Sequence, residues 1–249
     1  MKLLGIIPAR YDSTRFPGKP LINLNGKTMI ERVYEGVKKS EKITEIVVAT
    51  DDERIYSEVK RFGGNVVMTS KLHVSGTDRC GEVAALYPEM DIIINIQGDE
   101  PLVDYRQIDQ LASAFENQSI EIATLGIKQL TKEDIVNPNR IKIVVNSKQK
   151  ALYFSRSPIP NNTHCSENAL ENYPYLRHIG LYAYRASVLK KLINLTPTAL
   201  EKIESLEQLR WLYHGYDIQI IETDIETPNI DSPEDVAAVI NALNQKRNI

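Results

Sequence analysis

The first half of the chain alternates short apolar runs with longer amphipathic patterns, and this alternation most restricts its fold. The expected strands are 3–7, 46–49, 66–68, 92–96 and 122–125, and the expected helices are 29–39, 52–62, 77–86 and 107–115. Strands that alternate with helices favour right-handed crossovers and a parallel sheet covered on both faces. The sequence therefore predicts an α/β fold with a Rossmann-like, mostly parallel sheet and helices on both faces.

A polar loop follows the first apolar run directly. It carries three cationic side chains, Arg10, Arg15 and Lys19, among Gly, Pro and Ser residues. Open α/β sheets bind ligands at the carboxyl ends of their strands, where backbone N–H groups and fixed cations can hold phosphate. The loop is neither a Walker loop nor a G-x-G-x-x-G fingerprint. We interpret it as a polyphosphate site of another kind.

Composition excludes several classes of protein. The chain has 249 residues, enough for one large α/β domain or a core with a smaller subdomain. Its formal net charge of −3 provides no basic field for nucleic acid. The two cysteines lie in no metal-binding spacing, and no apolar run is long enough for a membrane span. We expect a cytoplasmic protein without membrane insertion or nucleic-acid partner.

The second half breaks the alternation. Strands are expected at 141–145, 151–154, 179–184 and 218–221, helices at 203–213 and after Ser232-Pro233, and a hairpin turn at 146–148. Few helices separate the first of these strands. We expect a smaller β-rich region, at about 137–200, that covers the substrate or makes the subunit contact.

Two carboxylates are candidate metal ligands. Asp99 follows the fourth apolar run, where Mg²⁺ could bind a carboxylate together with substrate phosphates. Asp231 would be its partner. Each has a structural alternative, because acidic residues also begin helices and turns. The loop Ser75-Gly76-Thr77-Asp78-Arg79 could contact a base or ribose, or Ser75 could simply cap a helix.

The second half also holds polar side chains near expected strand ends and in the 203–213 helix. They are Arg156, Arg177, His178, Tyr182, Glu207 and Gln208. An arginine and a histidine in a cleft could bind an acidic sugar. The structural alternative is a buried histidine with satisfied hydrogen bonds and a solvated Glu207.

With these residues assembled, the chain resembles the 3-deoxy-manno-octulosonate (Kdo) cytidylyltransferase family. The matching segments are IPAR (7–10), KPL (19–21), VATD (48–51), HVSGTDR (73–79), NIQGDEP (95–101), YFSR (153–156), LRHIGLY (176–182), LEQLR (206–210) and DSPED (231–235). They span nearly the whole chain. The first is shared with wider sugar nucleotidyltransferases, and the later ones are specific.

The resemblance implies a single nucleotidyltransferase domain over 1–249, of the nucleotide-diphospho-sugar transferase type. It would join CTP and Kdo into CMP-Kdo and pyrophosphate for lipopolysaccharide biosynthesis, as a homodimer that uses Mg²⁺. The implied catalytic residues are Arg10, Lys19, Asp99 and Asp231, of which Asp99 and Asp231 hold the metal. The implied nucleotide-binding residues are Pro8, Ala9, Arg10, Arg15, Lys19, Thr50, Ser75, Gly76, Thr77, Arg79 and Gln97. Those implied to bind the sugar are Arg156, His178, Tyr182, Glu207 and Gln208.

Two alternatives stay open. The segment 161–172 matches no motif of the family, which leaves room for a related acidic sugar such as 8-amino-Kdo or a sialic acid. The other alternative is a non-catalytic nucleotide-binding module. The presence of Arg10, Lys19, Asp99 and Asp231 together argues against it.

Overall fold

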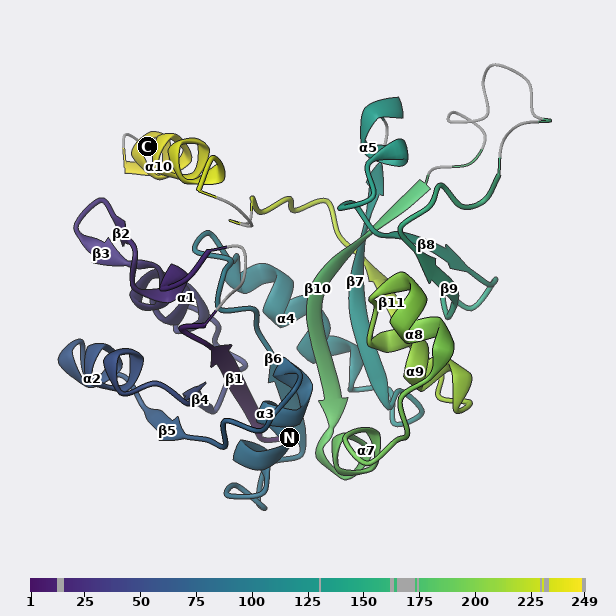
Figure 1. Ribbon diagram of the computed structural model, residues 1–249. Coiled ribbons are helices and arrows are strands. Elements are labelled where there is room, and N and C mark those ends of the chain that lie inside the picture. Colours follow the sequence, from purple (N-terminus) through teal and green to yellow (C-terminus); the bar gives the residue numbers. More distant parts are fainter. Residues whose placement is uncertain are drawn as a thin grey trace. The chain divides into compact units, whose positions relative to one another are not determined.

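The computed structural model divides into two units (Figure 1). It describes residues 1–12, 16–129, 131–161, 164, 173, 175–228, 230 and 233–247. The first unit contains Met1–Ala112 and Thr227–Ile249, and the second contains Ser113–Glu226. The predicted region 137–200 falls inside the second unit, and its role stays a prediction.

A parallel sheet forms the centre of the first unit. Its strands run in the order β6 (Ile92–Asn95), β1 (Leu3–Ala9), β4 (Glu45–Thr50) and β5 (Val66–Met68). The helices α1 (Met29–Val37), α2 (Glu53–Arg61) and α3 (Gly76–Ala84) follow strands of this sheet and contact them. Six of the seven residues of β1 are buried, as expected of a strand with both faces covered.

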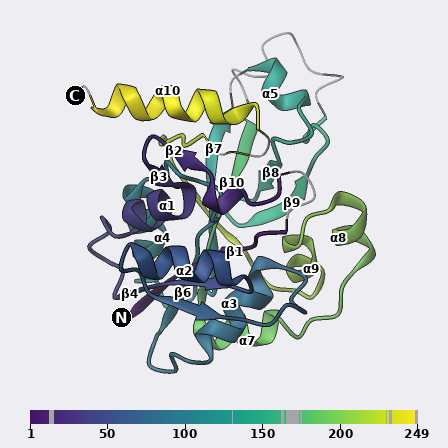
Figure 2. The ribbon, with the colours of Figure 1, turned by 60° about the vertical axis from the view of Figure 1, so that its left-hand side comes forward.

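Local signals begin and end these helices. Thr28 and Asp52 accept hydrogen bonds at the first turns of α1 and α2. Gly63, with a φ of 77°, follows α2 as the predicted helix stop. A short hairpin of β2 (Asn23–Leu24) and β3 (Lys27–Thr28) precedes α1, and α10 (Asp235–Arg247) lies beside it (Figure 2). This hairpin was not predicted.

The second unit contains a mixed sheet. Its strands are β7 (Ile122–Gln129), β8 (Lys142–Val145), β9 (Ala151–Ser155), β10 (Tyr175–Arg185) and β11 (Gln219–Glu222). β10 pairs antiparallel with β7 and β8, β8 pairs antiparallel with β9, and β11 runs parallel to β7. The helix α4 (Tyr105–Ala114) leads into this unit, and α5 (Lys132–Val136) and α7 (Ala186–Leu192) were not predicted.

The α/β class is confirmed, and so are the expected strands, with bounds that shift by a few residues. The single helix at 203–213 is wrong. The chain forms α8 (Ala199–Glu204) and α9 (Gln208–Tyr213) instead, because Ser205 adopts a left-handed conformation with a φ of 52° and ends α8. Among the helices that the structure describes, none has the length and apolarity needed to cross a bilayer.

Candidate functional site

The predicted nucleotide-binding residues lie at the carboxyl ends of the parallel strands. Pro8 and Ala9 end β1, Thr50 ends β4, and Gln97 follows β6. Because parallel strands end at one edge of a sheet, these residues face the same region of the first unit. Gly98 is packed here so closely that an added Cβ would lie 2.7 Å from the Pro8 carbonyl oxygen. Glycine at this position therefore permits the close approach of the segments that follow β1 and β6.

Helix α3 begins against the same edge. Ser75 caps it in a reciprocal capping box: its hydroxyl accepts from the Asp78 N–H, and the Asp78 carboxylate accepts from the Ser75 N–H. Gly76, the first helical residue, lies against Pro8, with 3.3 Å between an added Cβ and the Pro8 Cγ. The Ser75 side chain is thus used as a cap. What the helix brings to the end of β1 is the positive end of its dipole, which favours an anion there.

Arg79 is fully buried and joins helix α3 to the ends of two strands. Its Nη2 donates to Asp51 Oδ2 over 2.7 Å, and its Nη1 donates to the Thr69 hydroxyl. Thr69 in turn donates through its hydroxyl and its N–H to the Thr50 carbonyl oxygen. The guanidinium therefore joins α3 to the ends of β4 and β5. Asp51 and Thr69 were not predicted as site residues, although Asp51 follows its strand directly, the signal that identified Asp99.

The guanidinium of Arg10 is incompletely hydrogen-bonded. Its Nη2 is buried and has no hydrogen-bond partner among the residues that the structure describes. Burial and then the charge of Arg79 lower the pKa of Arg10, while Asp51 acts in the opposite direction. A buried donor without a partner is costly, and an anionic oxygen would remove that cost. The Nε of Arg79 is also buried without a partner among the described residues, but the Arg79 side chain is 0% exposed, so Arg10 is the more accessible anion-binding group.

Lys19 and Asp99 form an ion pair at the same edge. The Lys19 Nζ lies 2.7 Å from Asp99 Oδ2 and donates to the Ile230 carbonyl oxygen over 2.8 Å. The Ile230 N–H donates to the Asp99 carbonyl oxygen over 3.2 Å. Lys19 and Asp99 are thereby brought together, although they are 80 residues apart in the chain. Arg15 and Asp231 lie outside the described residues.

The carboxylate of Asp99 can serve as a metal ligand by its chemistry. Its side chain is 31% exposed, and its oxygens are the hard donors that Mg²⁺ prefers. Within the described ranges, no group of three or more His, Cys, Asp or Glu side chains could hold a metal ion. A magnesium site built from Asp99 would therefore need ligands from Asp231 or from substrate phosphates.

In the second unit, aromatic side chains surround His178 of β10. Its ring lies 5.3 Å from that of Phe154 and 5.2 Å from that of Tyr182, and its Nε2 is 3.0 Å from the Thr124 hydroxyl. Burial and then the charge of Arg177 lower the pKa of His178 to about 3. His178 is therefore neutral at pH 7 and offers a hydrogen bond, not a charge.

The remaining predicted sugar-binding residues differ in how fully their polar groups are used. Gln208 at the start of α9 has a buried Nε2 without a partner among the described residues, so it fits a ligand-binding role. Glu207 precedes it at the N-cap position. Arg156 instead donates from Nε, Nη1 and Nη2 to the carbonyl oxygens of Glu204, Pro138 and Ser205. Much of the Arg156 guanidinium is thus engaged in joining β9 to the end of α8.

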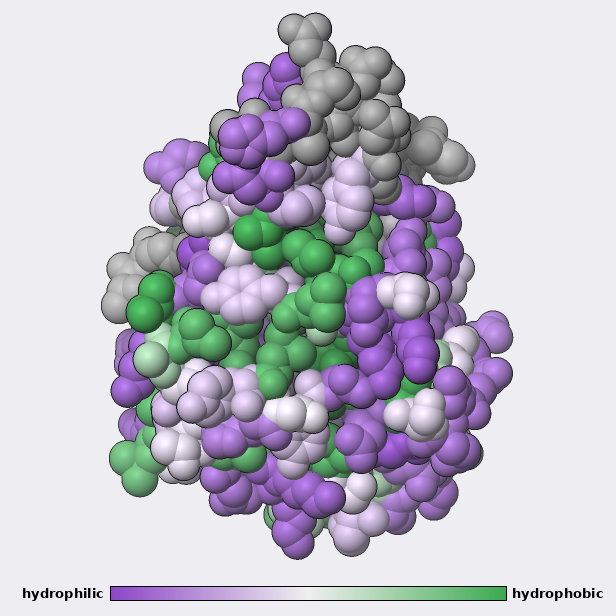
Figure 3. All heavy atoms as spheres, turned by 90° about the vertical axis from the view of Figure 1, so that its right-hand side faces the viewer, coloured by the Kyte–Doolittle hydropathy of each residue, from purple (hydrophilic) through white to green (hydrophobic). Residues whose placement is uncertain are grey.

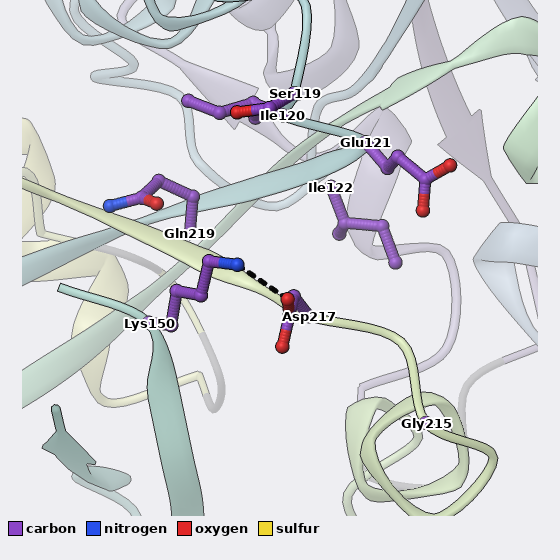
Figure 4. Close-up of a pocket in the computed structure, with 8 residues that line it drawn as sticks. All are labelled: Ser119, Ile120, Glu121, Ile122, Lys150, Gly215, Asp217 and Gln219. Carbon is purple, nitrogen blue, oxygen red and sulfur yellow. Dashed lines mark hydrogen bonds and ion pairs between the residues drawn. The ribbon is translucent and has the colours of Figure 1, made fainter. Parts of the chain in front are cut away.

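A small pocket of the second unit lies away from these residues. Its volume is about 110 Å³, and it is lined by Ser119, Ile120, Glu121, Ile122, Lys150, Gly215, Asp217 and Gln219 (Figure 4). An ion pair between Lys150 and Asp217 crosses it. It lies where β7 and β11 begin, at the opposite ends of these strands from those that bind ligands in α/β folds. We do not include it in the candidate site.

Comparisons with known proteins indicate the family of this chain. A family model described as cytidylyltransferase matches residues 4–220. A 3-deoxy-manno-octulosonate cytidylyltransferase of Cytophaga hutchinsonii is 51% identical over 242 residues, covering 96% of each chain. One of Fusobacterium nucleatum is 49% identical over 246 residues, covering 98% of each.

Solved structures agree as well. The structure of a CMP:2-keto-3-deoxy-manno-octonic acid synthetase complexed with CTP has a TM-score of 0.91 and 42% identity, covering 99% of this chain and 100% of that one. The 4-diphosphocytidyl-2C-methyl-D-erythritol synthase of Anaerococcus prevotii, at 12% identity and a TM-score of 0.65, shares the fold. The chain therefore belongs to the cytidylyltransferase family, and within it to the 3-deoxy-manno-octulosonate cytidylyltransferases.

Proposed function

We propose that the protein transfers CMP from CTP to the anomeric hydroxyl of Kdo and releases pyrophosphate. The observation that carries this proposal is the partnerless Nη2 of Arg10, close in sequence to Pro8, against which α3 begins, in a chain of this family. Both features favour an anion at the end of β1. A triphosphate is the anionic part of the nucleotide that such an enzyme uses.

The first unit holds the nucleotide. Arg10 and Lys19 bind the triphosphate and stabilise the negative charge that gathers on the departing pyrophosphate. Phosphoryl-type transfer requires alignment and charge neutralisation more than covalent help from the protein. The pairing of Lys19 with Asp99 supports this assignment, because it keeps the ammonium beside the strand edge before substrate arrives.

Asp99 and Asp231 hold Mg²⁺. Asp99 is partly exposed, and Ile230, the residue before Asp231 in the sequence, is hydrogen-bonded to both Asp99 and Lys19. When bound, Mg²⁺ supplies positive charge to the phosphate oxygens. We expect Asp99→Asn to lower kcat by orders of magnitude, with unchanged circular dichroism. Near-normal turnover of the folded variant would remove Asp99 from the metal site.

The second unit binds the sugar. The partnerless Nε2 of Gln208 supports a contact with a sugar hydroxyl or carboxylate, and neutral His178 contributes a hydrogen bond. Tyr182, Glu207 and Arg156 complete the proposed set. Arg156 would contribute N–H groups that its backbone contacts leave available, or act by shaping the loop it joins.

A pyrophosphate-release assay with Mg²⁺ tests the proposal. CTP, UTP and ATP are each combined with Kdo, 8-amino-Kdo and N-acetylneuraminate. We expect release with CTP and Kdo alone. Release with another acidic sugar would keep the reaction class and change the substrate. Folded protein that binds CTP but releases no pyrophosphate with any pair would be a binding module, contrary to the proposal.

We extend the proposal to assembly and place in the cell. Figure 3 shows apolar side chains gathered on a face of the second unit, and Leu152 of β9 and Ile203 of α8 are 58% and 81% exposed. Such surfaces often mark protein contacts, which supports a homodimer. Sedimentation at the 28.2 kDa of one chain at micromolar concentration would contradict it. The buried free thiol of Cys80 fits the reducing cytoplasm, where CMP-Kdo would serve lipopolysaccharide synthesis.

A further inference from the structure

Tyr11 connects the two ends of the loop that follows β1. Its carbonyl oxygen accepts a hydrogen bond from the Gly18 N–H over 2.9 Å. Its side chain lies against Gly18, where an added Cβ would be 3.2 Å from the Tyr11 Cε2, Cζ and hydroxyl oxygen, and Gly18 has a φ of 71°. Tyr11 follows Arg10 and Gly18 precedes Lys19, so this contact fixes the separation of the two proposed phosphate-binding cations.

Arg54 stacks on the Tyr11 ring. The central carbon of the Arg54 guanidinium lies 3.2 Å from the ring centroid, the distance of a close cation–π stack. Arg54 lies in the first turn of α2, outside the loop and outside every motif that indicated the family. A helix of the neighbouring βα unit therefore contacts the phosphate-binding loop through one planar side chain.

Asp52 holds this arginine in position. The Arg54 Nε and Nη2 donate to the two Asp52 carboxylate oxygens over 2.9 and 2.6 Å, and the Arg54 N–H also donates to Asp52. These hydrogen bonds raise the pKa of Arg54 and lower that of Asp52. Because Asp52 also caps α2, the guanidinium plane is set by the start of the helix. The arginine is thus oriented before any ligand binds.

We propose that Arg54 is a positioning residue for CTP binding: by stacking on Tyr11 it presets the loop that carries Arg10 and Lys19. The inference rests on the proposed function of that loop. A preset loop loses less conformational freedom when the triphosphate binds, so the gain appears as affinity for CTP. Affinity for the sugar would be unaffected.

Isothermal titration of CTP with Mg²⁺, in the absence of sugar, tests the inference. We expect Arg54→Ala and Tyr11→Ala each to raise the Kd for CTP about two- to fivefold. Tyr11→Phe keeps the ring and should bind as the wild type does. In the double variant, the loss of Arg54 should add nothing to the loss of Tyr11, because one contact is removed in both cases. The KM for CTP should follow the Kd, with the KM for Kdo unchanged.

Arg61→Ala is the matched control. Arg61 lies in the last turn of the same helix and is 59% exposed, against 56% for Arg54, but it pairs with Glu58 and Glu31 and not with Tyr11. The inference is overturned if Arg54→Ala binds CTP as tightly as Arg61→Ala does. It is also overturned if Arg54→Ala weakens CTP binding by the same factor with and without Tyr11→Ala, because Arg54 would then act by direct contact with the nucleotide. Wild-type protein that does not bind CTP would refute the proposed function instead.

Discussion

Asp51→Asn should strongly destabilise the first unit. Arg79 is 0% exposed and its partner Asp51 is 18% exposed, so the pair lies largely out of water. Loss of the carboxylate charge leaves the buried Arg79 guanidinium without its opposite charge, while Arg10 remains as a like-charged neighbour. Removing one partner of a buried pair costs about 3–5 kcal/mol, because the remaining charge is uncompensated.

Partial exposure of Asp51 places the expected loss at the lower end of that range, about 3 kcal/mol of unfolding free energy. For a chain of this size each kcal/mol lowers Tm by roughly 2–4 °C, so Tm should fall by about 6–12 °C. Circular dichroism during heating, together with urea titration at pH 7, measures both quantities. The double variant Asp51→Asn/Arg79→Met should recover part of the loss, since it also removes the buried guanidinium charge that has lost its partner.

Glu35→Gln is the control for the loss of a carboxylate charge. Glu35 pairs with Lys27 at the surface, where such pairs contribute about 0–1 kcal/mol. If Asp51→Asn lowers Tm no more than Glu35→Gln does, burial of the Arg79 pair is not the source of its stability. That result would refute the reasoning even if the variant were inactive.

Further predictions concern packing, pH and catalysis. Gly98→Ala should lower the free energy of unfolding by about 1–3 kcal/mol, because its Cβ would lie 2.7 Å from the Pro8 carbonyl oxygen. A urea titration that shows no loss would mean that the segments holding Pro8 and Gly98 can move apart freely. Burial and Arg177 lower the pKa of His178 from 6.5 to about 3, so the unfolded chain takes up a proton that the folded chain does not. The free energy of unfolding should therefore be retained above pH 6.5 and fall toward pH 3, by up to about 1.4 kcal/mol per pH unit. Urea titrations across pH 4–7 measure this slope, and His178→Gln should remove the part that His178 contributes. Lys19→Ala should lower kcat more than it changes the KM for Kdo, and steady-state kinetics that show a change in that KM alone would contradict its assignment to the triphosphate.

Much of the fold follows from local patterns. Apolar runs predicted β1, β4, β5 and β6 to within a few residues, because strand and helix periods are set by near neighbours in the chain. The end-of-strand rule then assigned Arg10 and Asp99 to one edge of the sheet. Local reasoning failed at 203–213, where amphipathic spacing continues through Ser205 although the backbone turns left-handed there.

By itself, the sequence determined the α/β class, the family and the edge of the sheet at which the predicted nucleotide-binding residues gather. What it left undecided is how each polar group is used. Arg79, Arg156 and Arg10 carry the same cation, yet the fold uses each one differently. Nη1 and Nη2 of Arg79 pair with Thr69 and Asp51 out of water, and Arg156 donates to backbone carbonyl oxygens. Arg10 is only partly buried, and its Nη2 has no partner among the described residues. The stack of Arg54 on Tyr11 is likewise invisible to any local pattern. Charge, burial and hydrogen bonding depend on neighbours that are distant in sequence, and only tertiary structure brings those neighbours together.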